Sequence, residues 1–285
     1  MRFTTRASTS ILQVALRNAQ HAHINKSVTQ HEFKVNNEDI KMDVELINHL
    51  RKLADKYETA DFIIGDPSWF MHQVNGDENQ ETMAFIASTL SYGSRKQFMP
   101  KIQILLDASE GRVAEWVKAK AYCQCLSDDD KCFYRLYTNR MMLRFFDSLR
   151  QMLLDYGSLF SAVKCNATDG ISAIAFLCRY FAQYNTNVIP KDTTSPCKRL
   201  AMFLRWMVRT ESPVDLGLWR FIDRRTLIIP LDTHVLQQSR QLKLVNSKSS
   251  SMRVAVALTN TLREAFPDDP TKGDFALFGL GVDNS

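Results

Sequence analysis

The chain has 285 residues, and 45% of them are hydrophobic, which is enough for a large domain with a buried core. Charged residues such as Arg179 interrupt every apolar run, so none approaches the roughly 20 apolar residues of a membrane helix, and we expect no membrane contact. The net charge of +5 comes mainly from one segment of the chain. Residues 1–31 contain four of the 36 basic residues and no acid, so the rest of the chain has 32 basic and 31 acidic residues. Overall charge therefore gives no argument for nucleic acid as a partner, and such an argument must come from local patterns.

The cysteines favour a reducing compartment. Most of the six lie within apolar, helix-like segments, and the chain shows no secretory signal, so we expect the protein in the cytoplasm. Cys123, Cys125 and Cys132 lack the spacing of zinc ligands and a matching fourth ligand. We therefore expect no metal site.

Residues 1–41 are poor in acids at their start and rich in Ser, Thr and Asn. We interpret them as a flexible basic tail. An organelle transit peptide has a similar composition, and a wrongly chosen start codon would also explain them, because Met42 opens the first amphipathic helical pattern. Residues 42–285 are then expected to form a single all-α domain, with room for two helical lobes.

From residue 42 onward, apolar residues recur mainly at intervals of three and four, which indicates helices. The one strand-like run, TLIIPL, contains a proline and has no evident partner strand. The sequence therefore predicts an all-α fold. The apolar faces that support it, in chain order, are Met83, Ile86 and Leu90; Met141, Phe145, Leu149 and Met152; Ile171, Ile174, Cys178 and Phe181, which Thr168 or Asp169 could cap; and Val254, Leu258, Leu262 and Ala265.

The segment SPCKRLAMFLRWMVR carries a row of basic residues. Ser195 as the cap and Pro196 in the first turn predict a helix of about four turns. At about 100° per residue, Lys198, Arg205 and Arg209 share one side, and apolar residues cover the opposite side. Such a row can bind a phosphate backbone, and it can equally be a face whose charges pair with acids from elsewhere.

A second candidate feature is the aspartate of LIIPLDTHVLQQSRQLKL. Asp232 precedes a helical pattern, and the N-terminus of a helix keeps a carboxylate ionised and fixed in place. A catalytic carboxylate needs both properties, but an ordinary N-cap uses the same interactions. His234 is similarly open to interpretation as a structural hydrogen-bonding residue or as a functional one.

These segments resemble two known families. LIIPLDTHVLQQSRQLKLV is similar to the DTH segment of the helix-hairpin-helix DNA glycosylase superfamily, which includes the endonuclease III-like and 8-oxoguanine glycosylases. ETMAFIASTLSYGSRKQ is similar to an early core helix of that fold, and DFALFGLGV is similar to its closing helix. The whole run from about Phe62 to Val282, including FIIGDPSWFMHQV, more closely resembles an uncharacterised bacterial family. The resemblance implies a two-lobed helical bundle with the helix-hairpin-helix DNA glycosylase fold.

The resemblance also implies roles for individual residues. Asp232 takes the position of the aspartate that stabilises the cationic sugar while a damaged base departs. Lys198 is the candidate for the lysine that attacks the sugar and forms a Schiff base. If Arg199 holds that position instead, Schiff-base chemistry is lost, and the resemblance implies only monofunctional cleavage of the bond to the base. The residues expected to contact nucleic acid are Arg199, Arg205, Arg209 and His234.

Two departures from the superfamily pattern bear on the expected ligands. The segment TTSPCKR replaces the glycine-containing hairpin that holds a phosphate, so phosphate binding would depend on the basic row. No cysteine follows Cys197, so we do not expect the iron–sulfur cluster of the endonuclease III-like branch, and we expect no cofactor.

Three functions remain open from the sequence. The first is a DNA-repair enzyme, a base-excision glycosylase with or without abasic-site lyase activity, which acts as a monomer on a damaged base flipped out of double-stranded DNA. The second is a non-catalytic nucleic-acid-binding protein with the same fold. The third is a helical interaction protein whose basic row is buried against acids. A structure in which Lys198 and Asp232 face one concave pocket would favour the first.

Overall fold

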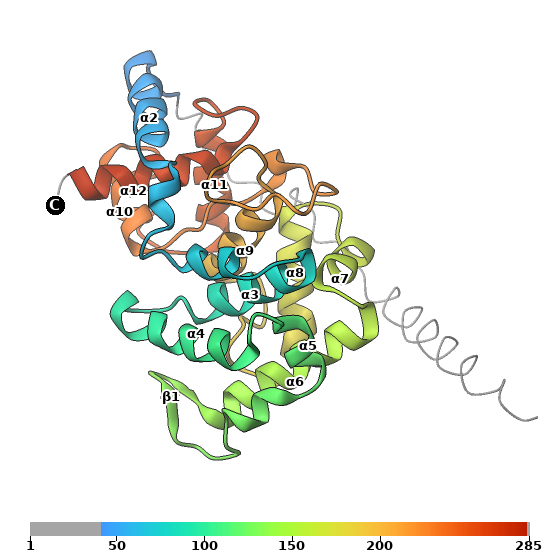
Figure 1. Cartoon of the computed structure of the whole chain (residues 1–285). Helices are drawn as coiled ribbons and strands as arrows, with labels where there is room; N and C mark the ends of the chain where they lie inside the picture. Colours follow the sequence, from blue (N-terminus) through green and yellow to red (C-terminus); the bar gives the residue numbers. More distant parts are fainter. Residues whose placement is uncertain (1–40, 284–285) are drawn as a thin grey trace, which may run out of the picture.

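The computed structural model describes residues 41–283, and these residues are mostly helical (Figure 1). The predicted tail at 1–41 thus lies almost wholly outside the described residues. The α-helices are α2 (Val44–Tyr57), α3 (Asp77–Leu90), α4 (Arg95–Ser109), α5 (Val113–Lys118), α6 (Asn139–Tyr156), α7 (Leu159–Asn166), α8 (Gly170–Ala182), α9 (Lys198–Val208), α10 (Thr233–Gln241), α11 (Met252–Leu262) and α12 (Gly273–Asp283). Short 3₁₀ segments are η2 (Ala60–Ile63), η3 (Pro67–Gln73), η4 (Ala121–Gln124), η5 (Arg224–Thr226) and η6 (Pro270–Lys272).

The predicted helical fold is confirmed, with one small exception. Strands β1 (Cys132–Tyr134) and β2 (Tyr137–Thr138) form an antiparallel hairpin that the sequence analysis did not predict. The run TLIIPL, by contrast, forms no strand. Among residues 41–283, none of the helices combines the length and the apolar character that crossing a bilayer requires.

The apolar spacing of three and four becomes buried faces in the structure. In α8, Ile171, Ile174, Cys178 and Phe181 are all inaccessible to solvent. Asp169 rather than Thr168 caps this helix, because its carboxylate accepts a hydrogen bond from the Ser172 backbone N–H at 2.8 Å.

Helix α3 lies at the centre of the molecule and is buried from Glu81 to Leu90. Its Phe85 ring stacks on Phe181 of α8 at 5.3 Å and on Phe145 of α6 at 6.0 Å, and it meets Phe203 of α9 edge-on at 5.1 Å. Contacts between aromatic rings add specific geometry to the burial of apolar surface. This cluster therefore fixes α9 relative to the central helix.

The first and last described helices pack against each other. Figure 1 shows α12 crossing α2 at one end of the molecule, with the β hairpin at the opposite end. The crossing is close because Gly279 has no side chain, and a Cβ atom there would overlap the Tyr57 ring. Helix α10 also packs on α12. The N-terminus of α10 is thereby held close to the C-terminal helix.

The start of α9 differs from the prediction. The helix begins at Lys198, and Cys197 occupies the N-cap position with a φ of 47° and no capping hydrogen bond from its side chain. The predicted Ser195 cap is therefore wrong, and Pro196 lies before the helix rather than in its first turn. Because the backbone at Cys197 is left-handed, the helix does not extend back to this residue, and Lys198 is its first residue.

Candidate active site

A cleft with a volume of about 950 Å³ opens among η2, η3, the start of α4, α9, α10 and α12. Four phenylalanines from three elements contribute to its apolar lining, namely Phe62 of η2, Phe98 of α4, and Phe275 and Phe278 of α12. The charged and titratable lining residues are Asp66, Arg95, Lys198, Arg205, Asp232, His234 and Asp274.

The two candidate catalytic residues are in contact within this cleft. Lys198, the first residue of α9, places its Nζ 3.0 Å from Oδ2 of Asp232, and the two side chains keep 36% and 30% of their surface exposed. Asp232 is the N-cap of α10, and its Oδ1 accepts the Val235 backbone N–H at 2.9 Å. Each carboxylate oxygen therefore has its own partner, and the pair still faces open space.

The surroundings of Asp232 favour its ionised form. Burial alone would raise the pKa of this carboxyl, but the charge of Lys198 and the hydrogen bonds from Val235 and Lys198 outweigh burial and hold the pKa below its usual range. The nearby His234 acts in the same direction. A carboxylate ionised at neutral pH is the form that can stabilise positive charge on a bound molecule.

Arg199 has a different role from its neighbour. Its guanidinium donates hydrogen bonds to the Thr89 carbonyl at 2.6 Å, to the Tyr137 hydroxyl at 2.6 Å and to the Val188 carbonyl at 2.9 Å. These bonds connect α9 to α3, to β2 and to the segment before α9. Of the two residues considered for the lysine position, Lys198 contacts Asp232 and Arg199 is directed elsewhere. His234 is exposed in the first turn of α10 and lines the cleft.

Of the two interpretations of the basic row, the structure has the one in which its charges pair with acids from elsewhere, because Arg205 and Arg209 are only 3% and 2% exposed. Helix α9 is buried all round from Leu200 to Val208. The helical wheel separates the basic residues from the apolar face correctly, but acids from other elements cover the basic side. Buried charges need such partners, since leaving water costs several kcal/mol per ion.

Four carboxylates pair with these two arginines. Arg205 contacts Asp215 at 3.3 Å and forms a short ion pair with Asp274. Arg209 contacts Glu58 at 2.7 Å and Asp269 at 2.8 Å, and it forms a short ion pair with Asp215. We refer to the two arginines and these four acids as the buried ion cluster. It meets the cleft at Arg205 and Asp274.

Sequence reasoning missed Arg95 and Asp274 among the charged residues of the cleft, and with Arg95 its partner Asp66. Arg95, the first residue of α4, pairs with Asp66 at 3.3 Å and keeps half of its side chain exposed. Asp274 lies in the first turn of α12. Both belong to segments noted for their family resemblance, SYGSRKQ and DFALFGLGV. Their partners are 29 and 69 positions away along the chain, so no local spacing reveals the pairs.

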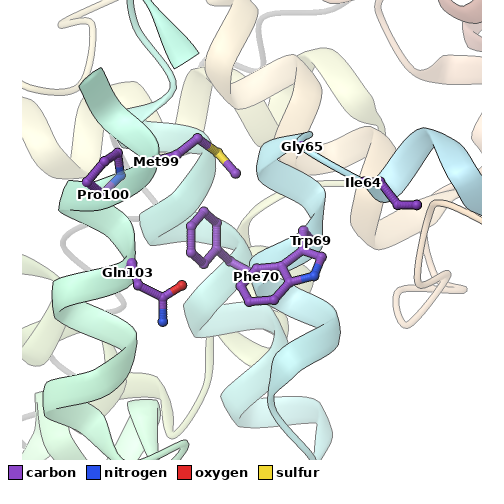
Figure 2. A pocket seen from close by; sticks show the side chains of 7 residues that line it. All are labelled: Ile64, Gly65, Trp69, Phe70, Met99, Pro100 and Gln103. Atoms are coloured by element: carbon purple, nitrogen blue, oxygen red, sulfur yellow. The ribbon is translucent and has the colours of Figure 1, made fainter. Parts of the chain in front are cut away.

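A second, smaller pocket of about 350 Å³ lies between η3 and α4 (Figure 2). Figure 2 shows the Phe70 and Trp69 rings side by side, with Phe70 facing Met99, Pro100 and Gln103 of α4. None of the side chains that line this pocket is titratable. This pocket therefore offers no side chain for acid–base or nucleophilic chemistry.

No group of three or more His, Cys, Asp or Glu residues within 41–283 is arranged to hold a metal ion. Cys123, Cys125 and Cys132 are exposed free thiols.

Comparison with family models matches residues 66–283 to the family described as protein of unknown function (DUF2400). The chain belongs to the DUF2400 family. This agrees with the uncharacterised family expected from the sequence, and the DUF2400 region contains every lining residue of the cleft except Phe62. Comparison with curated proteins found no match, and comparison with solved structures found none.

Proposed function

We propose that the protein is a base-excision DNA glycosylase that acts on a damaged base flipped out of double-stranded DNA into the cleft. The observation that carries the proposal is the contact between Lys198 and Asp232 at 3.0 Å, with both side chains facing the same cleft. The two residues come from the starts of α9 and α10, as the resemblance to the helix-hairpin-helix DNA glycosylases implies.

The pair supplies the two groups that the reaction needs. As the bond between C1′ of the deoxyribose and the base breaks, its electron pair leaves with the base and positive charge develops on the sugar. Asp232, ionised at neutral pH, stabilises that charge. The same carboxylate is placed to accept the proton that Lys198 must lose before its amine attacks C1′, which would leave a Schiff base open to strand cleavage.

The other lining residues suit a nucleic-acid substrate. Phe62 and Phe278, which are partly exposed, offer apolar rings that can stack on a flipped base, which is how aromatic residues commonly hold an extruded nucleotide. Besides Lys198, the exposed basic residues at the cleft are Arg95 and His234, and they are the groups we assign to phosphate contacts in place of Arg205 and Arg209. All of these residues belong to one chain, so we propose that a monomer suffices.

Burial of the basic row bears on the two alternatives. A non-catalytic nucleic-acid-binding protein would need exposed cations, and Arg205 and Arg209 are withdrawn from solvent into the buried ion cluster. A helical interaction protein accounts for that burial, but it gives no reason for a cleft that exposes a lysine–aspartate pair. A glycosylase accounts for the exposed pair, and its phosphate contacts are then assigned to Arg95 and His234 instead of the buried arginines.

The test is base release by the full chain from duplexes that each contain one lesion, namely 8-oxoguanine, uracil, hypoxanthine or thymine glycol. Asp232→Asn should abolish release and leave affinity for the duplex nearly unchanged, because asparagine still caps the helix but carries no charge. The matched control is Asp223→Asn, which changes the cap of η5 outside the cleft and should keep full activity. Release by the Asp232→Asn variant at the wild-type rate, or no release by the wild type from any duplex, would contradict the proposal.

A further inference from the structure

The buried ion cluster contains more carboxylates than cations. Arg205 and Arg209 face Asp215, Asp274, Glu58 and Asp269. Lys272 reaches Glu58 at 3.8 Å, but it also pairs with Asp55 at 2.8 Å. Even with Lys272 included, the cluster lacks at least one positive charge, and like charges in a buried site cannot all remain ionised at low energetic cost. We therefore expect one of the four acids to be protonated.

The contacts single out Asp274 as that acid. Asp215 contacts both arginines. Both carboxylate oxygens of Asp269 accept hydrogen bonds from Nε of Arg209, and its Oδ2 also forms an ion pair with Nη2. Glu58 pairs with Arg209 and Lys272. Asp274 has one cationic partner, Arg205, which it shares with Asp215. It is the least compensated member of the cluster.

The charged groups around Asp274 shift its pKa in opposite directions. Burial raises the pKa of Asp274, and the negative charges of Asp232 and Asp215 act in the same sense, while Arg205 and Lys198 oppose them. The net shift is upward, whereas the pKa of Asp232 is shifted downward. Asp66 and Arg95, which pair with each other, also line the cleft. Two carboxylates in one site whose pKa values are pushed apart are the usual arrangement of an acid and a base.

Among the four acids of the cluster, Asp274 is the one that reaches the cleft. Its side chain keeps 16% of its surface exposed and lines the same space as Lys198 and Asp232. Of the four acids, Asp215, Glu58 and Asp269 do not line it. Helices α10 and α12 pack together, so the two aspartates at their first turns are held in a fixed relation.

We infer that Asp274 is a second catalytic carboxylate, which donates a proton to the base as the base leaves. This inference rests on the proposed glycosylase function. The Asp274 carboxyl O–H gives its proton to a nitrogen or oxygen of the base while the C1′–N bond breaks and the bonding pair stays with the base. The base departs neutral, Asp274 is left ionised beside Arg205, and water restores its proton. General acid catalysis of this kind typically contributes about 10²- to 10⁴-fold in rate.

The experiment separates base departure from the chemistry that follows it. A duplex with an abasic site has no base to protonate, so trapping of the protein on that duplex by borohydride needs Lys198 and Asp232 but not Asp274. Asp274→Asn should therefore lower base release by about 10²-fold or more and leave trapping on the abasic duplex within a few-fold of the wild type. The variant should fold normally, because asparagine is neutral, as protonated Asp274 is, and has nearly the same shape.

Asp269→Asn is the matched control, since it removes a carboxylate from the same cluster at a position that does not line the cleft. It should keep both activities. Wild-type base release by Asp274→Asn, or an equal loss of release and trapping, would overturn the inference and leave the proposed function standing. A wild-type protein that neither releases a base nor is trapped would overturn the proposed function, and the inference with it.

If the wild type releases bases but is not trapped, the pH profile decides. Release should then fall at alkaline pH as Asp274 loses its proton, and Asp274→Asn should lack this alkaline limb. An unchanged limb in the variant would overturn the inference.

Discussion

In the proposed mechanism, Asp232 serves both the fold and the reaction. Its carboxylate caps α10 through the Val235 backbone N–H and pairs with Lys198 through the other oxygen. The cap fixes the position of the carboxylate and, with Lys198, keeps it charged. The structural role of this residue therefore supports the proposed catalytic role.

Arg209 is the residue on which the buried ion cluster depends most. It contacts Glu58, Asp215 and Asp269, and its guanidinium is almost fully buried. We predict that Arg209→Met lowers the free energy of unfolding by about 3–5 kcal/mol, because removing one partner leaves buried carboxylates without a counter-charge. Urea titration measures this difference.

Arg225→Met is the control for that measurement. Arg225 pairs with Asp223 at 2.6 Å, but both side chains are largely exposed, so this variant should unfold at the same urea concentration as the wild type. Equal midpoints for the Arg209 and Arg225 variants would show that the buried ion cluster does not stabilise the fold.

At the scale of elements, Glu81 connects three segments that are distant in sequence. From the buried face of α3 its carboxylate accepts the backbone N–H groups of Leu159 at 2.7 Å and Phe160 at 3.0 Å, at the start of α7. It also accepts the indole N–H of Trp219 at 3.0 Å. A side chain of one helix thereby caps another helix.

We predict that Glu81→Gln is destabilising and that the size of its effect depends on pH. Burial raises the pKa of Glu81 from its ordinary value of 4.5 to about 7, against the opposing effect of the three hydrogen bonds. A folded-state pKa above the unfolded value means that the group's contribution to stability is complete below pH 4.5 and is lost as the pH rises through about 7.

Urea unfolding of the wild type and of Glu81→Gln at pH 5 and pH 8 tests this prediction. The stability advantage of the wild type should be larger at pH 5, by on the order of 2–3 kcal/mol, and Glu115→Gln, at an exposed position of α5, should show no such change. An advantage that is independent of pH, or larger at pH 8, would contradict the raised pKa.

At the scale of the whole molecule, local spacing in the sequence predicts the helices well. The apolar faces in α3, α8 and α11 are buried as expected, because a period of three to four residues reports directly on a helix with one side in the core. The hairpin at β1 and β2 was missed because the two strands are short. The start of α9 was misplaced because Cys197 caps it with a left-handed backbone rather than a polar side chain.

The site was only partly predictable, for a reason of chain topology. Lys198 and Asp232 could be selected as candidates, because the resemblance to the helix-hairpin-helix DNA glycosylases points to both. The environment of Arg205 could not, because the acids that bury it come from a loop and from the last helix. Asp274 and Arg95 form pairs that only the folded chain brings together. Sequence patterns thus predict where a helix turns its polar side, but they do not predict what covers that side.

The most direct test of the central claim is borohydride trapping of the full chain on a duplex with one abasic site, followed by peptide mapping of the adduct. We predict a covalent adduct at Lys198 for the wild type, none for Lys198→Gln, and a wild-type yield for Lys164→Gln, whose side chain packs over Phe160 away from the cleft. An adduct mapped to a different lysine, or one that persists in Lys198→Gln, would contradict the claim that Lys198 and Asp232 form the reactive pair.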